Sequence, residues 1–318
     1  MLRLVPLCGA ILFAPAAQPT ASSAAFAQGY PARKLCIGGQ TYTLRDHDEF
    51  DRDSTLSVSD IWPPSGGKVW SNRFQWGRTN NPGTDDAYYP DRATVAAWGV
   101  PPVAAIVPGA GVSLSAYPVP RAFASDSSTV CSARPCRGHL AGLLTSNASH
   151  ASGYWVFSAK LPSGDGWWPA VWLQNETGSG GYDELDNEEE WGPSQFGPNV
   201  VQQTQQCVSP ACSGPSLYER TTVTTSATAQ HTYGALATSN YVGFYIDNVP
   251  TTSRYPRFTQ SGLDPIMNLQ VCTKDSYCAP APATDARAAM IVKYYRYYAP
   301  PDKPAPCPEP YDLPPLPP

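Results

Sequence analysis

The sequence predicts an all-β fold, most simply a β-sandwich, and three observations support this prediction. The 318 residues include 35 prolines and 25 glycines, which imply many turns and little helix. Helical periodicity is weak throughout. The segments with strand character are short and rich in β-branched or aromatic residues, as in 111–117, 153–160, 241–247 and 290–298. Many short strands joined by loops of variable length are typical of a sandwich.

The N-terminal 27 residues have the pattern of a secretory signal peptide. Residues 1–3 give a positive start, an apolar stretch follows over 4–17, and Ala-Phe-Ala at 25–27 is a suitable cleavage site. The apolar stretch is short and is interrupted by Pro6 and Pro15, which disfavours a membrane span. The alternative is a buried N-terminal helix. We expect a secreted or periplasmic protein.

Residues 28–299 are enough for one large β domain with a sizeable core. The segment that follows, 300–318, is about half proline, so it should be extended and cannot join a central strand. Cys307 is expected to attach the first part of this tail to the N-terminal end of the domain. Residues beyond about Pro310 are expected to be mobile.

The composition excludes some partners and favours others. Charged residues make up only 15% of the chain, the net charge is −5, and there is no basic patch, so nucleic acid is an unsuitable partner. The 18 tyrosines and 9 tryptophans are many for this length. Flat aromatic rings cover the C–H faces of sugars, so the composition favours a carbohydrate ligand. We expect a monomer.

The cysteines predict four disulfides. Eight remain after cleavage of the signal peptide, and an even number in an exported chain is typical of disulfides. Six of them are near neighbours in sequence and can close small loops, which leaves one at each end of the domain. The pairs we expect are Cys36–Cys307, Cys131–Cys136, Cys207–Cys212 and Cys272–Cys278. Thiolate metal binding is disfavoured because the chain has no CxxC spacing and few histidines.

The most informative motif is an acidic run, Glu184-Leu185-Asp186-Asn187-Glu188-Glu189. Cleavage of a glycosidic bond usually needs two carboxyl groups at a fixed separation, and crowded carboxyls separate in pKa, so that one can be an acid while another is ionised. In a regular strand, alternation places Glu184, Asp186 and Glu188 on one face and Glu189 on the other. A solvated acidic face and a calcium loop are the alternatives.

This run and its surroundings resemble glycoside hydrolase family 16. Glu184 to Glu189, with Trp191-Gly192 after it, resembles the Glu-x-Asp-x-x-Glu signature of that family. The preceding segment, 166–173, resembles the strand ahead of the active site. Weaker supporting segments follow in the family's order, and together they cover roughly residues 40 to 299: 47–51, 143–146, 153–162, 231–234, 244–247, 265–269 and 290–298.

The resemblance implies a fold and a set of roles. It implies a jelly roll of two antiparallel sheets with a concave substrate cleft. Glu184 would be the nucleophile, Asp186 its assistant and Glu189 the acid/base. Glu189 reaches the catalytic face only if the strand contains a bulge, and Glu188 is then turned away. The alternative is an unbulged strand that uses Glu188.

Substrate contacts are expected from aromatic and amide side chains near the run. Trp168, Trp172 and Trp191 are the candidate sugar platforms, although each could belong to the core. Many members of the family place a histidine on the strand after the signature. This chain has glutamines there, and Gln205 is the candidate, which can bind but cannot titrate. Asn187 is a second departure, because the family usually has an apolar residue at that position.

These observations predict an exported retaining endo-glycosidase that hydrolyses a β-linked polysaccharide, with β-1,3- or β-1,3/1,4-glucan favoured. A transglycosylase, or an exopolysaccharide or galactan depolymerase, on the same fold is the first alternative. A non-catalytic carbohydrate-binding jelly roll is the second. No cofactor and no catalytic metal are expected. The resemblance allows a structural calcium ion, for which no ligand set is evident in the sequence.

Overall fold

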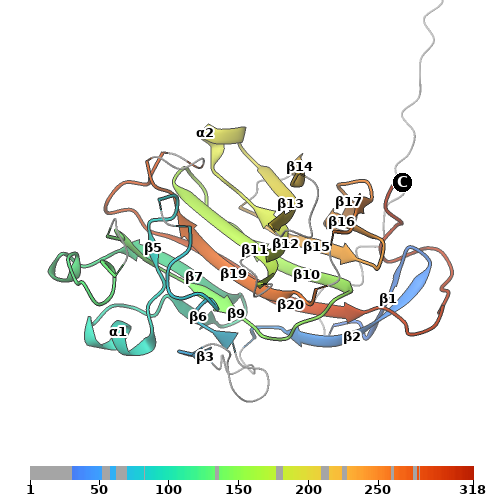
Figure 1. The fold of residues 1–318 in the computed structure, drawn as a ribbon, viewed down its shortest axis with the longest axis horizontal. Coiled ribbons are helices and arrows are strands. Elements are labelled where there is room, and N and C mark those ends of the chain that lie inside the picture. Colours follow the sequence, from blue (N-terminus) through green and yellow to red (C-terminus); the bar gives the residue numbers. More distant parts are fainter. Residues whose placement is uncertain are drawn as a thin grey trace, which may run out of the picture.

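Two β-sheets packed face to face form the protein in this computed structural model (Figure 1). The structure describes residues 31–318 apart from 52–57, 62–69, 82, 133–135, 177–181, 209–214, 224–227, 259–260, 275–277 and 279. The expected signal peptide lies outside the described residues. None of the described helices is long and apolar enough to cross a bilayer.

The larger sheet contains twelve strands among the described residues. They are β1 (Lys34–Ile37), β2 (Gln40–Asp48), β5 (Ala87–Tyr88), β6 (Ala104–Val107), β7 (Gly111–Pro118), β8 (His139–Ala141), β10 (Gly153–Lys160), β15 (Gln230–Ala237), β16 (Tyr241–Ile246), β17 (Val249–Pro250), β18 (Tyr255–Pro256) and β20 (Ala288–Ala299). Their order is β17-β16-β15-β10-β20-β7-β8-β5, and β1, β2, β6 and β18 pair along this path.

The smaller sheet contains eight strands in the order β14-β13-β12-β11-β19-β9-β4-β3. They are β3 (Val58–Ser59), β4 (Trp70–Ser71), β9 (Leu143–Thr145), β11 (Trp167–Glu176), β12 (Tyr182–Glu189), β13 (Val200–Val208), β14 (Leu217–Thr222) and β19 (Asp264–Val271). Helices are short, namely α1 (Arg92–Ala97), α2 (Pro193–Phe196) and a 3-10 turn at Arg121–Phe123. Pairing is antiparallel except for β3 with β4 and β5 with β8. The predicted all-β sandwich is thereby confirmed.

The core lies between the two sheets, where alternate residues of facing strands meet. Trp155 and Phe157 of β10 and Tyr295 of β20 pack against Val171 of β11 and Leu185 of β12, and each is at most 1% exposed. Alternation then directs the neighbours of Val171 and Leu185 to the other side of the smaller sheet. That outer side carries the candidate site.

Strand β20 is central to the larger sheet, although it is the last strand in the sequence. Over its twelve residues it pairs with β10 on one side, and with β7 and β2 on the other. Its partners therefore include strands from both the N-terminal and the middle parts of the chain. The larger sheet is complete only when β20 is in place.

Three of the four expected disulfides are present. The structure joins Cys36 to Cys307, Cys131 to Cys136 and Cys272 to Cys278. The fourth pair cannot be assessed, because Cys212 and the side chain of Cys207 lie outside the described residues.

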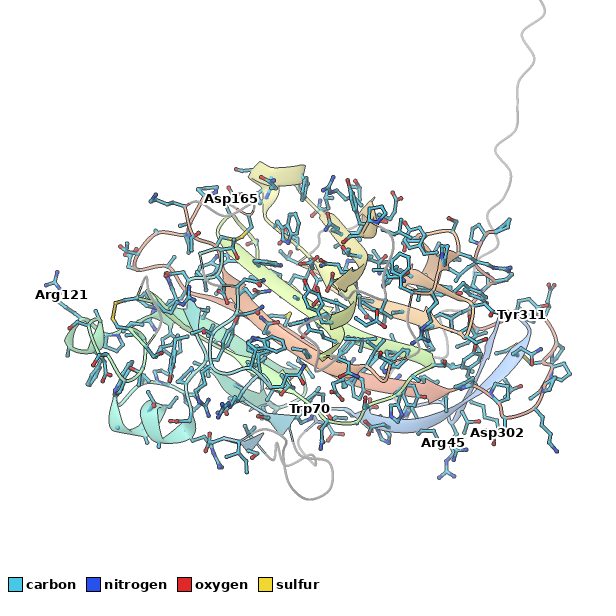
Figure 2. The ribbon with its side chains drawn as sticks, in the orientation of Figure 1. Arg45, Trp70, Arg121, Asp165, Asp302 and Tyr311 are labelled. Carbon is cyan, nitrogen blue, oxygen red and sulfur yellow. A yellow bond between two sulfur atoms is a disulfide. The ribbon has the colours of Figure 1, made fainter. Side chains whose placement is uncertain are left out.

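The expectation of a mobile tail beyond Pro310 is wrong. Leu313 and Leu316 are 0% and 3% exposed and belong to a hydrophobic cluster with β1, β16 and β20. The Tyr245 hydroxyl donates to the carbonyl of Pro314 at 3.0 Å. Figure 2 shows Tyr311 beside the end of the molecule that β1 forms. Proline content predicts that the segment cannot join a central strand, but it does not predict that two leucines between the prolines attach it to the sheet.

Candidate active site

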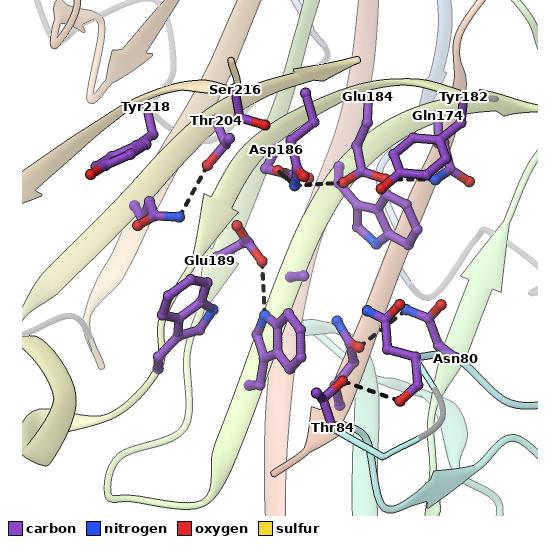
Figure 3. A pocket seen from close by; sticks show the side chains of 18 of the residues that line it. Asn80, Thr84, Gln174, Tyr182, Glu184, Asp186, Glu189, Thr204, Ser216 and Tyr218 are labelled. Carbon is purple, nitrogen blue, oxygen red and sulfur yellow. Dashed lines mark hydrogen bonds between the residues drawn. The ribbon is translucent and has the colours of Figure 1, made fainter. Parts of the chain in front are cut away.

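Three carboxylates face a common cleft from strand β12. The side chains of Glu184, Asp186 and Glu189 line an open cleft with a volume of about 1120 Å³, and they point into it in Figure 3. A regular strand could not present all three. The ladder to β13 runs regularly to Asp186↔Thr204 and resumes at Glu189↔Gln202. Two residues of β12 therefore oppose Gln203 alone, which is the predicted bulge.

The inserted residue of the bulge is Asn187. On the other side of β12, Asp186 pairs with Trp172 and Glu188 pairs with Val171, so Asn187 has no partner on β11. Its amide donates instead to the carbonyls of Trp155 and Tyr233 on the facing sheet, at 3.3 and 3.4 Å. An amide at a position where an apolar residue was expected thus fastens the bulge to the opposite sheet.

Glu188 lies on the side of β12 away from the cleft. It is fully buried, it does not line the cleft, and it lies close enough to Tyr233 of the facing sheet to affect the pKa of that residue. Neither of its carboxylate oxygens has a hydrogen-bond partner among the described residues. Burial and the nearby Glu190 and Glu189 raise the pKa of Glu188 well above its ordinary value. The structure therefore excludes Glu188 from the catalytic face and favours its neutral form.

Amide side chains hold Glu184 from both neighbouring strands. Gln174 of β11 donates to Glu184 Oε2 at 2.6 Å, and Gln206 of β13 donates to Glu184 Oε1 at 2.8 Å. The same Gln206 nitrogen lies 3.1 Å from Asp186 Oδ2, so it bridges the two carboxyls. Donors of this kind favour the ionised form of a carboxyl and fix its direction.

Glu189 lies in a more aromatic environment. The Trp168 indole donates to Glu189 Oε1 at 3.0 Å, and the Trp191 and Gln202 side chains lie near enough to lower the pKa of this carboxyl. The Trp168 and Trp191 rings meet edge to face with centroids 5.9 Å apart. The shielding of this carboxyl from water favours the protonated form, whereas the indole N–H donor favours the ionised form.

Burial is the main cause of the raised pKa values of the carboxyls in this site. It raises the pKa of Glu184, Asp186 and Glu189, and the other carboxyls raise that of Glu184 and Asp186 further. The hydrogen bonds from glutamine and tryptophan lower these pKa values and oppose that effect in part. Since three negative charges so close together repel one another, the group titrates as a unit and retains a proton at neutral pH.

The floor and walls of the cleft are aromatic and amide side chains. The cleft crosses strands β19, β11, β12, β13 and β14, and the residues that line it beyond those already named include Trp76, Asn80, Phe196, Tyr218, Arg220 and Gln270. A chain of three hydrogen bonds holds Trp172 at the floor of the cleft. The Trp172 indole donates to the Asn268 side-chain oxygen at 2.8 Å, and the Asn268 amide donates to the Tyr89 hydroxyl at 3.0 Å. The Tyr89 hydroxyl in turn donates to the buried Asp85 carboxyl at 3.0 Å.

The candidate sugar platforms all reach the cleft, but the candidate glutamine does not. Trp168, Trp172 and Trp191 line it. The prediction for Gln205 is wrong, because its side chain is 1% exposed and donates to the carbonyl of Pro256 on the other side of the sheet. Alternation on β13 presents Gln202, Thr204 and Gln206 to the cleft and turns Gln203 and Gln205 inward.

Sequence reasoning also missed residues that the cleft contains. Gln174 is ten residues ahead of Glu184, and Gln202 and Gln206 belong to a run of polar residues with no alternation of hydrophobicity. The register of that run against β12 could have identified both glutamines, but only once the bulge was counted. Among the described residues, no group of three or more His, Cys, Asp or Glu side chains is placed to hold a metal ion. A structural calcium ion stays a prediction.

Comparison with protein families connects the cleft to a known group. The model of glycosyl hydrolases family 16 matches residues 122–285, just over half of the chain, and the matched stretch includes the carboxylate run. No curated protein matches the sequence significantly.

Solved structures share the fold at low sequence identity. The laminarinase catalytic domain from Thermotoga maritima aligns with a TM-score of 0.58 and 19% identity over 81% of this chain and 98% of that one. The endo-β-1,3-glucanase from Pyrococcus furiosus aligns at 0.59 and 20% over 84% and 98%. A structure connected with endo-acting O-glycanases that human gut bacteria use to initiate mucin breakdown aligns at 0.59 and 21% over 85% and 94%. These likenesses establish the jelly roll.

Proposed function

The chain belongs to glycosyl hydrolase family 16, and on this premise we propose that it is an exported, retaining endo-glycosidase that hydrolyses β-1,3- or β-1,3/1,4-glucan. The observation that carries the proposal is the bulge in β12, which brings Glu184, Asp186 and Glu189 to one cleft. Glucanases among the structural neighbours support the choice of glucan.

The first step in this mechanism forms a covalent intermediate. The Glu184 carboxylate attacks the anomeric carbon, the glycosidic C–O bond breaks, and Glu189 gives its proton to the departing oxygen. Retaining enzymes need these two carboxyls roughly 5–5.5 Å apart. The register supports such a gap, because Glu184 and Glu189 pair with Gln206 and Gln202, four residues apart on β13. Backbone positions so spaced are about 13 Å apart, and the side chains that lean together shorten the gap.

The second step releases the sugar. Glu189, now ionised, removes a proton from water, the water oxygen attacks the anomeric carbon, and the bond to Glu184 breaks. Gln206 bridges Glu184 and Asp186, which supports a role for Asp186 in the alignment of the nucleophile. The burial of Glu189, which raises its pKa to about 7, supports its role as the proton donor.

The cleft supports the choice of an internal cut in a neutral glycan. It crosses five strands, so several sugar units can lie along it. Tryptophan faces bind the apolar sides of sugar rings, and amides such as Gln174, Asn80 and Gln270 bind hydroxyl groups. The apolar segment at 4–17 and the site at 25–27 support export, with a mature chain that begins at Gln28. We also propose that the enzyme acts as a monomer.

Substitution of the carboxyls tests the mechanism. Glu184→Gln and Glu189→Gln should each lower kcat on laminarin by at least about 1000-fold, while Glu184→Gln still binds laminarin oligosaccharides. Glu188→Gln is the matched control from the same strand, and it should retain most of the activity. A Glu188→Gln variant as inactive as Glu189→Gln, with the fold intact, would contradict the assigned acid.

A substrate screen tests the specificity. Laminarin, mixed-linkage glucan, agar-type galactan and an acidic exopolysaccharide would be incubated with the mature enzyme and the products followed by NMR and mass spectrometry. We expect short β-glucan oligosaccharides whose reducing ends appear first in the β form. Longer products would indicate transglycosylation, and binding without cleavage of any polymer would indicate a non-catalytic jelly roll.

A further inference from the structure

Glu189 is the first of three polar side chains in a row across the smaller sheet. Glu189 of β12 pairs with Gln202 of β13, and Gln202 pairs with Arg220 of β14. All three line the cleft. Arg220 is the one basic side chain among the described residues that do so.

The orientation of the Gln202 amide depends on Arg220. Arg220 Nε donates to Gln202 Oε1 at 3.0 Å. A guanidinium has donors and no acceptor, so only the oxygen end of the amide can face it. The nitrogen end then faces the other way, where Nε2 donates to Thr204 Oγ1 at 3.1 Å (Figure 3). Gln202 pairs with Glu189 across the ladder and lowers the pKa of that carboxyl, which is the effect of an N–H donor and not of an oxygen.

Arg220 is itself held in place by aromatic rings. Its guanidinium lies 3.8 Å from the centroid of the Phe196 ring and 4.8 Å from that of Tyr218. Phe196 is the last residue of α2, and the Trp191 ring packs on it with centroids 5.2 Å apart. Planar stacking of this kind restricts the directions in which Nε can point.

We propose that Arg220 is a positioning residue for the acid/base Glu189, and that it acts by fixing Gln202 as a hydrogen-bond donor toward that carboxyl. The inference rests on the proposed function. Without Arg220, the Gln202 amide could turn by 180° and present its oxygen to Glu189, because the two orientations are nearly equal in shape. An oxygen there would favour the protonated acid and oppose the carboxylate that the second step requires.

Other charged groups also face Glu189 and belong in the comparison. Glu184 and Asp186 flank it in the cleft and Glu188 lies behind it. Its uncharged neighbours on the adjacent strands are Ala170 and Gln202, which pair with it, and Trp168, which donates to it. None of these is changed by a substitution at Arg220. A change in the titration of Glu189 can therefore be assigned to Gln202 or to the lost positive charge.

The test compares Arg220→Met with wild type through the pH dependence of kcat/KM on laminarin. The alkaline limb of this profile reports the pKa of the general acid in the free enzyme, which is Glu189 in the proposed mechanism. We expect this limb to move upward by about 0.5–1 pH unit in Arg220→Met, because a donor to the carboxylate is lost. Arg287→Met is the matched control, since Arg287 is also exposed and lies over a tyrosine ring but outside the cleft. Its limb should stay in place.

A double-mutant cycle separates the two explanations. In a Gln202→Leu background, Arg220→Met should add no further shift. The inference is overturned if Arg220→Met leaves the limb unchanged, or if the shift is as large in the Gln202→Leu background, which would indicate a direct effect of charge. A direct effect would also weaken with added salt, whereas an amide orientation would not.

A second measurement keeps this inference separate from the proposed function. The indole N–H of Trp168 donates to Glu189, so its NMR resonance should titrate with that carboxyl. The same upward displacement is expected in Arg220→Met. If wild type cleaves no glucan while the resonance shifts as expected, the proposed function fails and the positioning role stands.

Discussion

At the scale of single residues, the side chains that donate hydrogen bonds to the carboxyls of the site are amides and an indole, which do not titrate. Gln174, Gln206 and Trp168 donate hydrogen bonds to the carboxyls, and no histidine is among the described residues that line the cleft. An amide orients a carboxylate without changing its own charge. The pH dependence of turnover should therefore report the carboxyls themselves, as one coupled group.

Glu188 lowers the free energy of unfolding when it is ionised, because its carboxyl is fully buried. A carboxyl without a hydrogen-bond partner, buried between two sheets, is stable only in its protonated form. The unfolded chain loses that proton near pH 4.3, whereas the folded protein retains it to a much higher pH. Because the folded state binds more protons at Glu188 over this range, the contribution of Glu188 to stability is greatest below about pH 4 and falls as the pH rises.

Glu188→Met should therefore stabilise the protein more at pH 8 than at pH 5. Methionine has a similar length and no charge, so it removes the pH-dependent cost. The gain in the free energy of unfolding should grow with pH by up to about 1.4 kcal/mol per unit. Denaturant unfolding at the two pH values measures it, with Glu219→Met on the exposed face of β14 as the control. An equal change at both pH values would show that Glu188 is ionised in the native protein.

At the scale of elements, the bulge is one extra residue in an otherwise regular strand. If Asn187 were absent, Asp186 and Glu188 would follow each other directly in β12. On the β11 side they would pair with Trp172 and Val171, which are also consecutive. On the β13 side they would pair with Thr204 and Gln203, which are consecutive as well. Both ladders would then run without a shift. Alternation would still present Glu184, Asp186 and Glu189 on one face.

Deletion of Asn187 should consequently leave a folded protein with measurable turnover. Stability should fall, because the two bonds from Asn187 to the facing sheet are lost. Deletion of Leu185 is the matched control, and it should abolish turnover because it reverses the alternation between Glu184 and the rest of the run. Laminarin hydrolysis and near-UV circular dichroism of both variants provide the measurement. Equal loss in both, with the fold retained, would contradict this description of the strand.

The candidate site could be predicted from the sequence where a pattern showed which side chains of a strand point to the same face. Strand β12 has Leu185 as an apolar marker and a family-like signature, and these were enough to predict the bulge and to place Glu189. Strand β13 is polar at almost every position from Gln202 to Gln206. Which residues of β13 point into the cleft depends on its pairing with β12, which is a long-range contact. The sequence alone therefore does not distinguish Gln205 from Gln206 as the residue that reaches the cleft.

At the scale of the whole molecule, the tail is part of the fold. Leu316 fills the space over Gly243, where even a single added carbon would meet its side chain. The all-β class followed from composition and short apolar segments. The docking of 313–316 did not, because composition reports the stiffness of a proline-rich chain and not the surface that receives its two leucines.

Leu316→Ala should lower the free energy of unfolding by about 2–4 kcal/mol, since it empties a packed site on the larger sheet. Turnover at low temperature should be unchanged, because the cleft lies on the other sheet. Val249→Ala on the neighbouring β17 is the control, as Val249 is 57% exposed, and it should change stability by less than about 0.5 kcal/mol. Thermal unfolding of the two variants measures the difference. A Leu316→Ala variant as stable as the control would show that the tail is detached in solution.

Strand β20 follows every other described strand in the sequence, yet it takes the middle of the larger sheet. A nascent chain that ends before residue 288 holds β10 and β7 with unpaired edges toward each other. Such edges recruit other strands, including those of neighbouring chains. The chain must therefore be protected from association until β20 has been made, and premature termination anywhere before β20 should yield aggregates rather than a smaller working enzyme.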